Sequence, residues 1–280
     1  MSVRFSVLGS GSRGNATLVA TQSTRIMVDA GFSGRELAKR LDAVGAAPTE
    51  LSAILLTHEH ADHTRGAGVF ARAHGTPLYM TAGTRQACDS LLTGSETVHI
   101  YRPGRPVTFD DLVVEPFITV HDARDPVAIV VSRPAADLRL GIATDLGKPG
   151  VQAKHALRAC DALVIESNHD EQMLWAASYP AAVKSRIASS HGHLSNRGAA
   201  ALAVELLSPR LSVVVLAHLS EETNTPALAR STMERALAKR GYKGRVVVAG
   251  PDRPTPLLDL ADLRRRVRPA QLSLFRHSPG

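Results

Sequence analysis

The stretch THEHADH, residues 57–63, places three histidines and one aspartate within six positions: His58, His60, Asp62 and His63. It follows LSAILL, an apolar run typical of a buried strand. Polar groups this close to a core lose hydration unless they bind something. Extended residues two apart face the same side, so His58 and His60 can share one ion, while Asp62 and His63 face a second position on the turn. Imidazole and carboxylate ligands suit zinc, manganese or iron; the alternative is a solvated polar loop.

Three more candidate ligands each follow a later apolar run. They are His121 in PFITVHDA, Asp145 in LGIATDLG and His218 in VVVLAHLS. A single polar residue at a strand end is more often structural than functional, so none of the three carries much weight alone. Combined with the first cluster, they complete a set of seven candidate metal ligands.

The chain alternates short strand-like runs with helical stretches and shows no repeat of fixed period. We expect one α/β domain over residues 1–260, with mixed sheets covered by helices. A helix is predicted from SGRELAKRLDAVG, with Ser33 as its N-cap. Residues 261–280 are predicted to be a basic, flexible tail, because they hold five arginines and one aspartate and so carry +4 of the formal charge of +7.

Other features of the sequence indicate where in the cell the protein acts and argue against a membrane protein. No apolar run approaches the ~20 residues that a membrane helix needs, and the start of the sequence lacks the apolar centre of a signal peptide. We therefore expect a cytoplasmic protein that does not bind membranes. Cys88 and Cys160 lie far apart and are expected to be buried free thiols.

The seven ligands resemble those of the metallo-β-lactamase superfamily. HxHxDH is matched by residues 58–63, and the later His, Asp and His follow in the same chain order. The resemblance implies an αββα four-layer sandwich with two divalent metal ions, zinc or manganese, or alternatively iron. It implies that one ion is held by His58, His60 and His121, the other by Asp62, His63 and His218, and that Asp145 bridges them. Hydrolysis is the implied reaction.

Four further stretches resemble the YycJ/WalJ branch of nucleases within that superfamily. They are GSGSRGN at residues 9–15, VIESNHD at 164–170, SSHGHLSN at 189–196 and AHLSEETN at 217–224. The resemblance implies a DNA exonuclease. That branch is expected to have an Asn pair after HLSEE, where this chain has Thr223 and Asn224. This chain therefore departs from the branch at the first position of that pair.

Other residues near these stretches are candidates for catalysis and substrate binding. His193 is expected to contact the substrate phosphate or protonate the leaving oxygen, and Asp62 is assigned to catalysis as well as to metal binding. The candidate substrate-binding residues are Ser12, Asn15, His193, Ser195 and Asn196. Either Ser195 or Asn196 is also expected to cap the following helix. Glu166, His169 and Asp170 are candidates for orienting the metal ligands.

The loop GSGSRG, residues 9–14, also matches the GxGxxG pattern of dinucleotide-binding proteins. That reading requires a helix to begin at the loop, and NATLVAT instead predicts a strand. The loop either offers backbone N–H groups to a phosphate or forms a simple tight turn. Aromatic residues make up only 4% of the chain, so a platform for stacking bases is not evident.

The tail contains QLSLF, which resembles the pentapeptide that binds the bacterial DNA polymerase sliding clamp. The match covers Gln271, Leu272, Ser273, Leu274 and Phe275. It implies that the apolar side chains fill a cleft on the clamp, with the arginines before them as a basic tether. Such a tether would hold a nuclease at replication-linked repair. The alternative is a segment that folds back onto its own domain.

Three competing functions stay open at this stage. The same fold and metals serve an RNA-processing nuclease or a hydrolase of small thioesters, esters or lactones, because fold and metals do not identify the substrate. A non-catalytic binding module is the third, although such a protein would be free to lose ligands. Cleavage of matched DNA and RNA substrates would separate the two nucleases.

Overall fold

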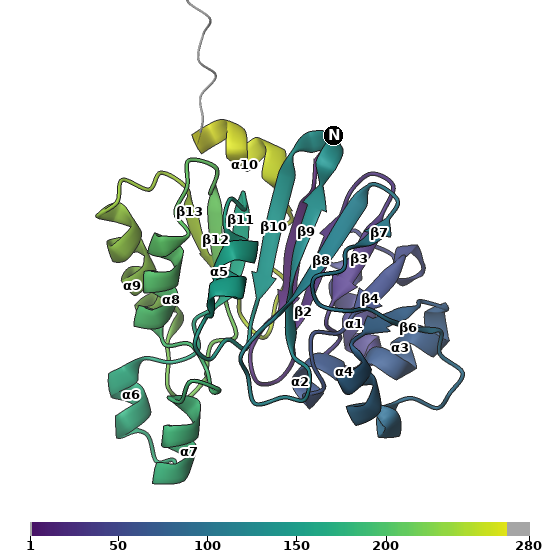
Figure 1. The fold of residues 1–280 in the computed structure, drawn as a ribbon, viewed down its shortest axis with the longest axis horizontal. Helices are drawn as coiled ribbons and strands as arrows, with labels where there is room; N and C mark the ends of the chain where they lie inside the picture. The colour runs from purple at the N-terminus through teal and green to yellow at the C-terminus, as the bar shows by residue number, and fades with distance from the viewer. Residues whose placement is uncertain (1, 268–280) are drawn as a thin grey trace, which may run out of the picture.

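The computed structural model describes residues 2–267, which form two seven-stranded sheets (Figure 1). The first sheet has the order β14 (Leu258–Asp259), β1 (Arg4–Gly9), β2 (Ala16–Ala20), β3 (Arg25–Val28), β4 (Ala53–Leu55), β5 (Leu78–Met80), β6 (Val98–Ile100). The second has the order β13 (Arg245–Val248), β12 (Val213–Ala217), β11 (Ala162–Glu166), β10 (Leu138–Ala143), β9 (Val127–Arg133), β8 (Leu112–Ile118), β7 (Val107–Phe109). Both are mixed: β3 to β6 run parallel in the first, and β10 to β13 in the second.

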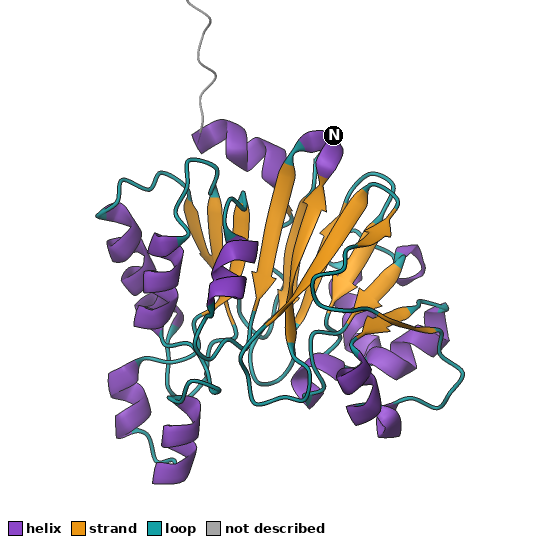
Figure 2. Ribbon diagram, in the orientation of Figure 1, coloured by secondary structure: helices purple, strands orange, loops and turns teal. Residues whose placement is uncertain are grey.

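Helices cover the outer side of each sheet, and others lie at the upper and lower ends of the sandwich (Figure 2). The first half of the chain supplies α1 (Gly34–Asp42), α2 (Ala61–Thr64), α3 (Ala67–His74) and α4 (Ala82–Ala87). The second half supplies α5 (Val151–Leu157), α6 (Glu171–Ala176), α7 (Ala181–Ile187), α8 (Asn196–Glu205), α9 (Pro226–Ala238) and α10 (Leu260–Val267). Short 3₁₀ turns occur at Pro48–Glu50, Asp89–Leu91 and Pro134–Ala136.

Three hydrophobic clusters show how the layers are held together. The largest lies between the sheets, where Phe5 and Ile26 of the first meet Ile129 and Val215 of the second. The other two clusters join each sheet to its helices, one through α1 and α3 and the other through α5, α8 and α9. Apolar burial on both faces explains why the strand sequences read as nearly continuous apolar runs. The predicted αββα four-layer sandwich is confirmed.

Most expected elements occur where they were predicted. Ser33 caps α1, accepting a hydrogen bond from the backbone N–H of Glu36, and Ser195 caps α8 through the N–H of Gly198. The loop of residues 9–14 leads into β2, so the helix that a dinucleotide site requires is not there. Both cysteines are buried and free, as predicted.

The end of the described chain differs from the expectation of a tail from residue 261. Residues up to 267 belong to α10, because Leu260 and Leu263 are buried in the cluster between the sheets. Arg264 Nη1 also donates to the backbone oxygen of Asp137 at 2.7 Å. The segment Gln271–Phe275, with its predicted clamp-binding residues, lies outside the described residues.

Candidate metal centre

The seven predicted ligands meet at one edge of the sandwich, where α2 lies at the lower end of Figure 1. His58 follows β4, Asp145 follows β10 and His218 follows β12. The carboxyl ends of parallel strands share an edge, and the stacked sheets bring their two edges together. These three ligands lie just beyond buried strands, so their backbones are anchored, whereas Asp62 and His63 are supplied by α2.

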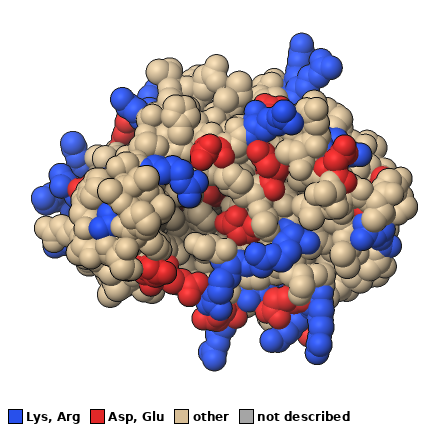
Figure 3. All heavy atoms as spheres, turned by 90° about the horizontal axis from the view of Figure 1, so that it is seen from below, with Lys and Arg blue, Asp and Glu red and all other residues tan. Residues whose placement is uncertain are grey.

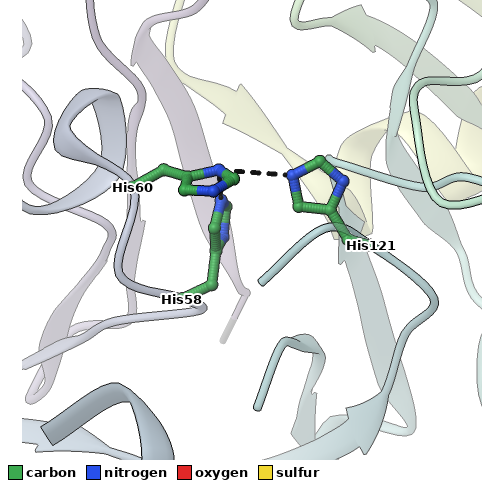
Figure 4. Close-up of side chains that lie close together, drawn as sticks. All are labelled: His58, His60 and His121. Carbon is green, nitrogen blue, oxygen red and sulfur yellow. Dashed lines mark hydrogen bonds between the residues drawn. The ribbon is translucent and has the colours of Figure 1, made fainter. Parts of the chain in front are cut away.

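His58, His60 and His121 form the first group of possible ligands (Figure 4). His60 Nδ1 lies 3.1 Å from His58 Nε2 and 3.3 Å from His121 Nε2. Nitrogen ligands about 2.0–2.1 Å from a tetrahedral ion stand roughly 3.3 Å from one another. The three nitrogens are therefore spaced as ligands of one ion.

Asp62, His63 and His218 form the second group. Asp62 Oδ2 lies 3.5 Å from His63 Nε2 and 3.2 Å from His218 Nε2. Asp145 reaches both groups, since Oδ2 lies 3.0 Å from His63 Nε2 and Oδ1 lies 3.7 Å from His121 Nε2. The structure thus brings all seven predicted ligands together in the two predicted groups, with Asp145 between them.

Acceptors behind the histidines fix which ring nitrogen faces the site. His63 Nδ1 lies 2.8 Å from Asp29 Oδ2, His121 Nδ1 lies 3.2 Å from the Gly192 carbonyl oxygen, and His218 Nδ1 lies 3.0 Å from Glu166 Oε1. An acceptor at Nδ1 holds the proton there and leaves Nε2 with a free lone pair. The three imidazoles are therefore set to donate Nε2 to a cation.

Asp29 is a functional residue that the sequence reasoning missed. Its carboxylate accepts hydrogen bonds from Thr57, from both the backbone N–H and the hydroxyl, besides holding His63. Asp29 directly follows the apolar residues Ile26–Val28, just as His121, Asp145 and His218 each follow an apolar run. Asp29, Asp145 and His218 all have positive φ, at 62°, 55° and 55°. This conformation is uncommon for residues other than glycine, and three of the six such residues in the described chain lie at the site.

Glu166 joins the metal centre to His193. It is fully buried at the end of β11, and its Oε1 lies 2.8 Å from His193 Nδ1 as well as 3.0 Å from His218 Nδ1. Its Oε2 accepts the backbone N–H groups of Leu146 and Leu194, each at 2.8 Å. Glu166 is thus placed to orient a ligand, as expected, and it also holds His193 beside the centre.

The protein's own charges prepare the carboxylates to bind a cation. Burial alone would raise the pKa of Asp62, but hydrogen bonds from His218 and His63 hold it well below its ordinary value. Burial would likewise raise the pKa of Asp145, and the charges of His218 and His63 lower it far below normal. Glu166 is lowered in pKa in the same way, chiefly by His193 acting against burial. All three carboxylates are therefore ionised at neutral pH.

The donor set fits divalent metal ions. Asp145 Oδ2 is buried and lies 3.0 Å from His63 Nε2. With the His63 proton held at Nδ1 by Asp29, these two atoms face each other with lone pairs, which is costly unless a cation lies between them. Imidazole nitrogens and carboxylate oxygens are ligands that zinc, manganese and iron accept. The cluster is therefore a metal centre for divalent ions.

The candidate substrate-binding residues occupy different kinds of position. His193 is partly exposed beside the centre, and Ser12 is exposed on the β1–β2 loop. Asn15 is buried, and its Nδ2 lies 3.2 Å from Asp62 Oδ2, so it positions a ligand. Ser195 caps α8 and donates to Glu171 Oε1 at 3.0 Å.

Asn196 belongs to a buried amide network. Its Oδ1 accepts from Ser167 and Asn224, and its Nδ2 donates to Asn224 Oδ1. The neighbouring Thr223 is fully buried, and its hydroxyl has no hydrogen-bond partner within the described part of the chain. Asn224 thus has a structural role in the stretch where an Asn pair was expected.

Comparison with known proteins identifies the class of protein. The chain belongs to the metallo-β-lactamase superfamily, whose family model matches residues 9–218. The structure of YhfI from Bacillus subtilis, a metallo-β-lactamase fold protein, superimposes with a TM-score of 0.70 at 17% identity. The match covers 91% of this chain and all of the YhfI chain. Human tRNase Z, short form, covers 91% of this chain and 99% of that chain with a TM-score of 0.61 at 16% identity. At such identities these two likenesses show the fold alone.

Curated relatives place the chain within one branch of this superfamily, that of WalJ and YycJ. Over 265 residues the chain is 36% identical to the exodeoxyribonuclease WalJ of Streptococcus pneumoniae serotype 2, covering 92% of this chain and 98% of the relative. Over 244 residues it is 35% identical to the exodeoxyribonuclease YycJ of Bacillus anthracis. That match covers 86% of this chain and 92% of the relative. The protein is a metal-dependent hydrolase related to both, and the predicted resemblance to the YycJ/WalJ branch is confirmed.

Proposed function

We propose that this protein is a metal-dependent exodeoxyribonuclease. The observation that carries the proposal is a complete metal centre within a chain that matches exodeoxyribonucleases over nearly the whole length of both. The face at the lower end of the sandwich carries Lys and Arg side chains interspersed with Asp and Glu (Figure 3). Binding of DNA there would therefore depend on local contacts more than on one strongly positive surface.

We propose that two ions are bound. Two separate ligand groups, with Asp145 within reach of both, support this number. When bound, such ions polarise a phosphodiester and lower the pKa of water. Zinc and manganese are the proposed metals, with iron as the alternative. Elemental analysis of purified protein should give about two ions per chain, and one ion per chain would contradict the binuclear site.

His193 is the proposed general acid. Its Nδ1 is held by the Glu166 carboxylate, so Nε2 is the ring atom left to contact substrate. A hydrogen bond to a carboxylate keeps an imidazole oriented and favours its protonated form, which can give a proton to the leaving oxygen. Asp62 is proposed to act through the metal that it binds, oriented by Asn15, and Ser12 is proposed to contact the DNA backbone.

Cleavage of end-labelled DNA and of RNA of the same sequence tests the proposal. Wild-type protein with manganese or zinc should degrade DNA, and a chelator should abolish this. His60→Ala removes the nitrogen common to both short contacts of the first group and should reduce the rate at least ~100-fold. Cleavage of RNA alone would reject the exodeoxyribonuclease proposal and favour an RNA-processing enzyme.

Cytoplasmic action and a tether to the sliding clamp are part of the proposal. A DNA substrate supports the location, while within residues 2–267 the structure has no helix suited to crossing a membrane. The clamp contact rests on the QLSLF match at Gln271–Phe275. Replacing Leu274 and Phe275 with alanine should abolish binding to a bacterial clamp in a pull-down. Unchanged binding would reject the tether and its role in replication-linked repair.

A further inference from the structure

A cavity lies directly beside the metal centre, with His193 on its wall. It has a volume of about 490 Å³, within the range of cavities that hold small ligands. Its walls include Lys148, His169, Trp175 and Ser190, and His193 forms part of it as well. Because His193 also contacts the ligand-orienting Glu166, a molecule in this cavity would lie next to the reacting phosphodiester.

His169 is a buried side chain with one orphaned ring nitrogen. It is 2% exposed, and its Nδ1 is buried without a hydrogen-bond partner among residues 2–267. Its backbone is engaged through the N–H of Asn196 and a bridge to Ser195. A buried ring nitrogen without a hydrogen bond is costly. Because His169 lines the cavity, a turn of its ring that presented Nδ1 to a ligand there would remove that cost.

Trp175 supplies a flat apolar surface at the same cavity. It lies on α6, which with α7 projects below the sheets in Figure 1, and it is 56% exposed. Lys184 Nζ of α7 donates to the backbone oxygen of Trp175 at 2.8 Å, which holds the two helices together. A large exposed aromatic side chain at a cavity wall is suited to stacking against a planar ligand.

Lys148 adds an available positive charge. It is exposed on the loop after Asp145, and its ammonium group forms no ion pair with the described residues. Its backbone N–H donates to the Ser190 carbonyl oxygen at 2.8 Å, so the two sides of the cavity are joined. A cation, an indole and an imidazole with an orphaned nitrogen around one cavity match the phosphate, base and polar edge of a nucleotide.

We propose that this cavity binds the terminal nucleotide of the DNA strand being degraded. The base stacks on Trp175, its polar edge contacts His169, and Lys148 contacts a phosphate. The next phosphodiester then lies at His193 and the metal centre, so the enzyme would cleave one nucleotide from an end. This inference rests on the proposed exonuclease function and adds the feature that makes cleavage terminal. On this proposal Trp175 supplies the stacking surface that the low aromatic content does not make evident.

Intrinsic fluorescence offers a direct test, because Trp175 is the only tryptophan in the sequence. Metal-loaded wild-type protein would be titrated with a deoxynucleoside 5′-monophosphate and, separately, with deoxyribose 5-phosphate, which has no base. Saturable quenching by the nucleotide alone is expected. No change with the nucleotide, or an equal change with the sugar phosphate, would overturn the stacking contact. Tighter binding of the ribonucleotide would assign the cavity to RNA and also overturn the proposal.

Kinetics on short single-stranded DNA provide the second measurement. Trp175→Ala should raise KM about tenfold, within the range of one lost base-stacking contact, with little change in kcat. Trp175→Phe should retain most of the affinity. Ile100→Ala is the matched control, an exposed apolar residue on β6 at the edge of the other sheet, 49% exposed. Unchanged KM in Trp175→Ala would contradict the inference.

The two measurements separate this inference from the proposed function. DNA cleavage that requires metal, together with silent fluorescence and unchanged KM, would overturn the cavity assignment and leave the exonuclease in place. Quenching by the nucleotide without any DNA cleavage would reject the exonuclease while retaining a nucleotide-binding cavity.

Discussion

The carboxylate of Glu166 has four hydrogen-bond partners at the site, and replacing it with glutamine removes one of its two acceptor atoms. Oε1 serves the imidazoles of His193 and His218, and Oε2 serves the backbone N–H groups of Leu146 and Leu194. Glutamine keeps one oxygen and presents an NH₂ group at the other position. Whichever way the amide turns, two of the four donors face another donor. They are either the two backbone N–H groups or the two imidazoles, which then lose their acceptor unless their protons move to Nε2, the nitrogen that faces the metal.

The expected cost follows from that count. A buried donor left without a partner costs about 1–3 kcal/mol, so Glu166→Gln should lower the free energy of unfolding by about 2–6 kcal/mol. If the NH₂ group faces the imidazoles, His218 is no longer oriented with Nε2 toward the metal. Loss of such a partner typically reduces metal affinity ~10–100-fold.

Urea unfolding in the presence of a chelator would measure the stability, and competition with a coloured chelator would measure metal affinity. Glu115→Gln is the matched control: Glu115 lies on β8 of the same sheet, with its side chain 40% exposed and one long contact of 3.7 Å to Arg139. That change should alter stability by less than about 0.5 kcal/mol. If Glu166→Gln is as stable as its control and binds metal normally, the carboxylate does not have the role assigned here.

Two further predictions follow from buried groups. Burial raises the pKa of Cys88 to about 11 and that of Cys160 to about 12. Both thiols should therefore stay protonated at pH 8 and react with Ellman's reagent only on unfolding. Rapid reaction of the native protein would contradict this prediction. Gly31→Ala would place a Cβ 1.7 Å from the backbone oxygen of the ligand Asp62. It should therefore lower both thermal stability and metal affinity, whereas Gly150→Ala, with no atom within 4 Å, should lower neither, as differential scanning calorimetry and metal titration would show.

Three of the metal ligands could be predicted because each one lies at the end of an apolar strand sequence. His121, Asp145 and His218 each end an apolar run, and parallel strands bring their carboxyl ends to one edge. Asp29 carries the same signal after β3 but was missed. An aspartate at a strand end also suits an ordinary turn, and only the approach of His63, 34 positions along the chain, shows what it does.

Other features depend on packing that a local pattern does not reveal. The arginines of α10 suggest a solvated tail, yet Leu260 and Leu263 are spaced to bury one face of a helix. α6 and α7 are short and separated near Pro180, so their sequences lack a sustained helical period. The cavity beside Trp175 draws its walls from segments between residues 147 and 195, which no single motif brings together.

The most direct test of the central claim is the size of the products released from DNA labelled at one end. Wild-type protein loaded with metal should release mononucleotides from the first time point, and His60→Ala should release none. Release of internal fragments before mononucleotides, or undiminished cleavage by His60→Ala, would contradict an exodeoxyribonuclease that works through this metal centre.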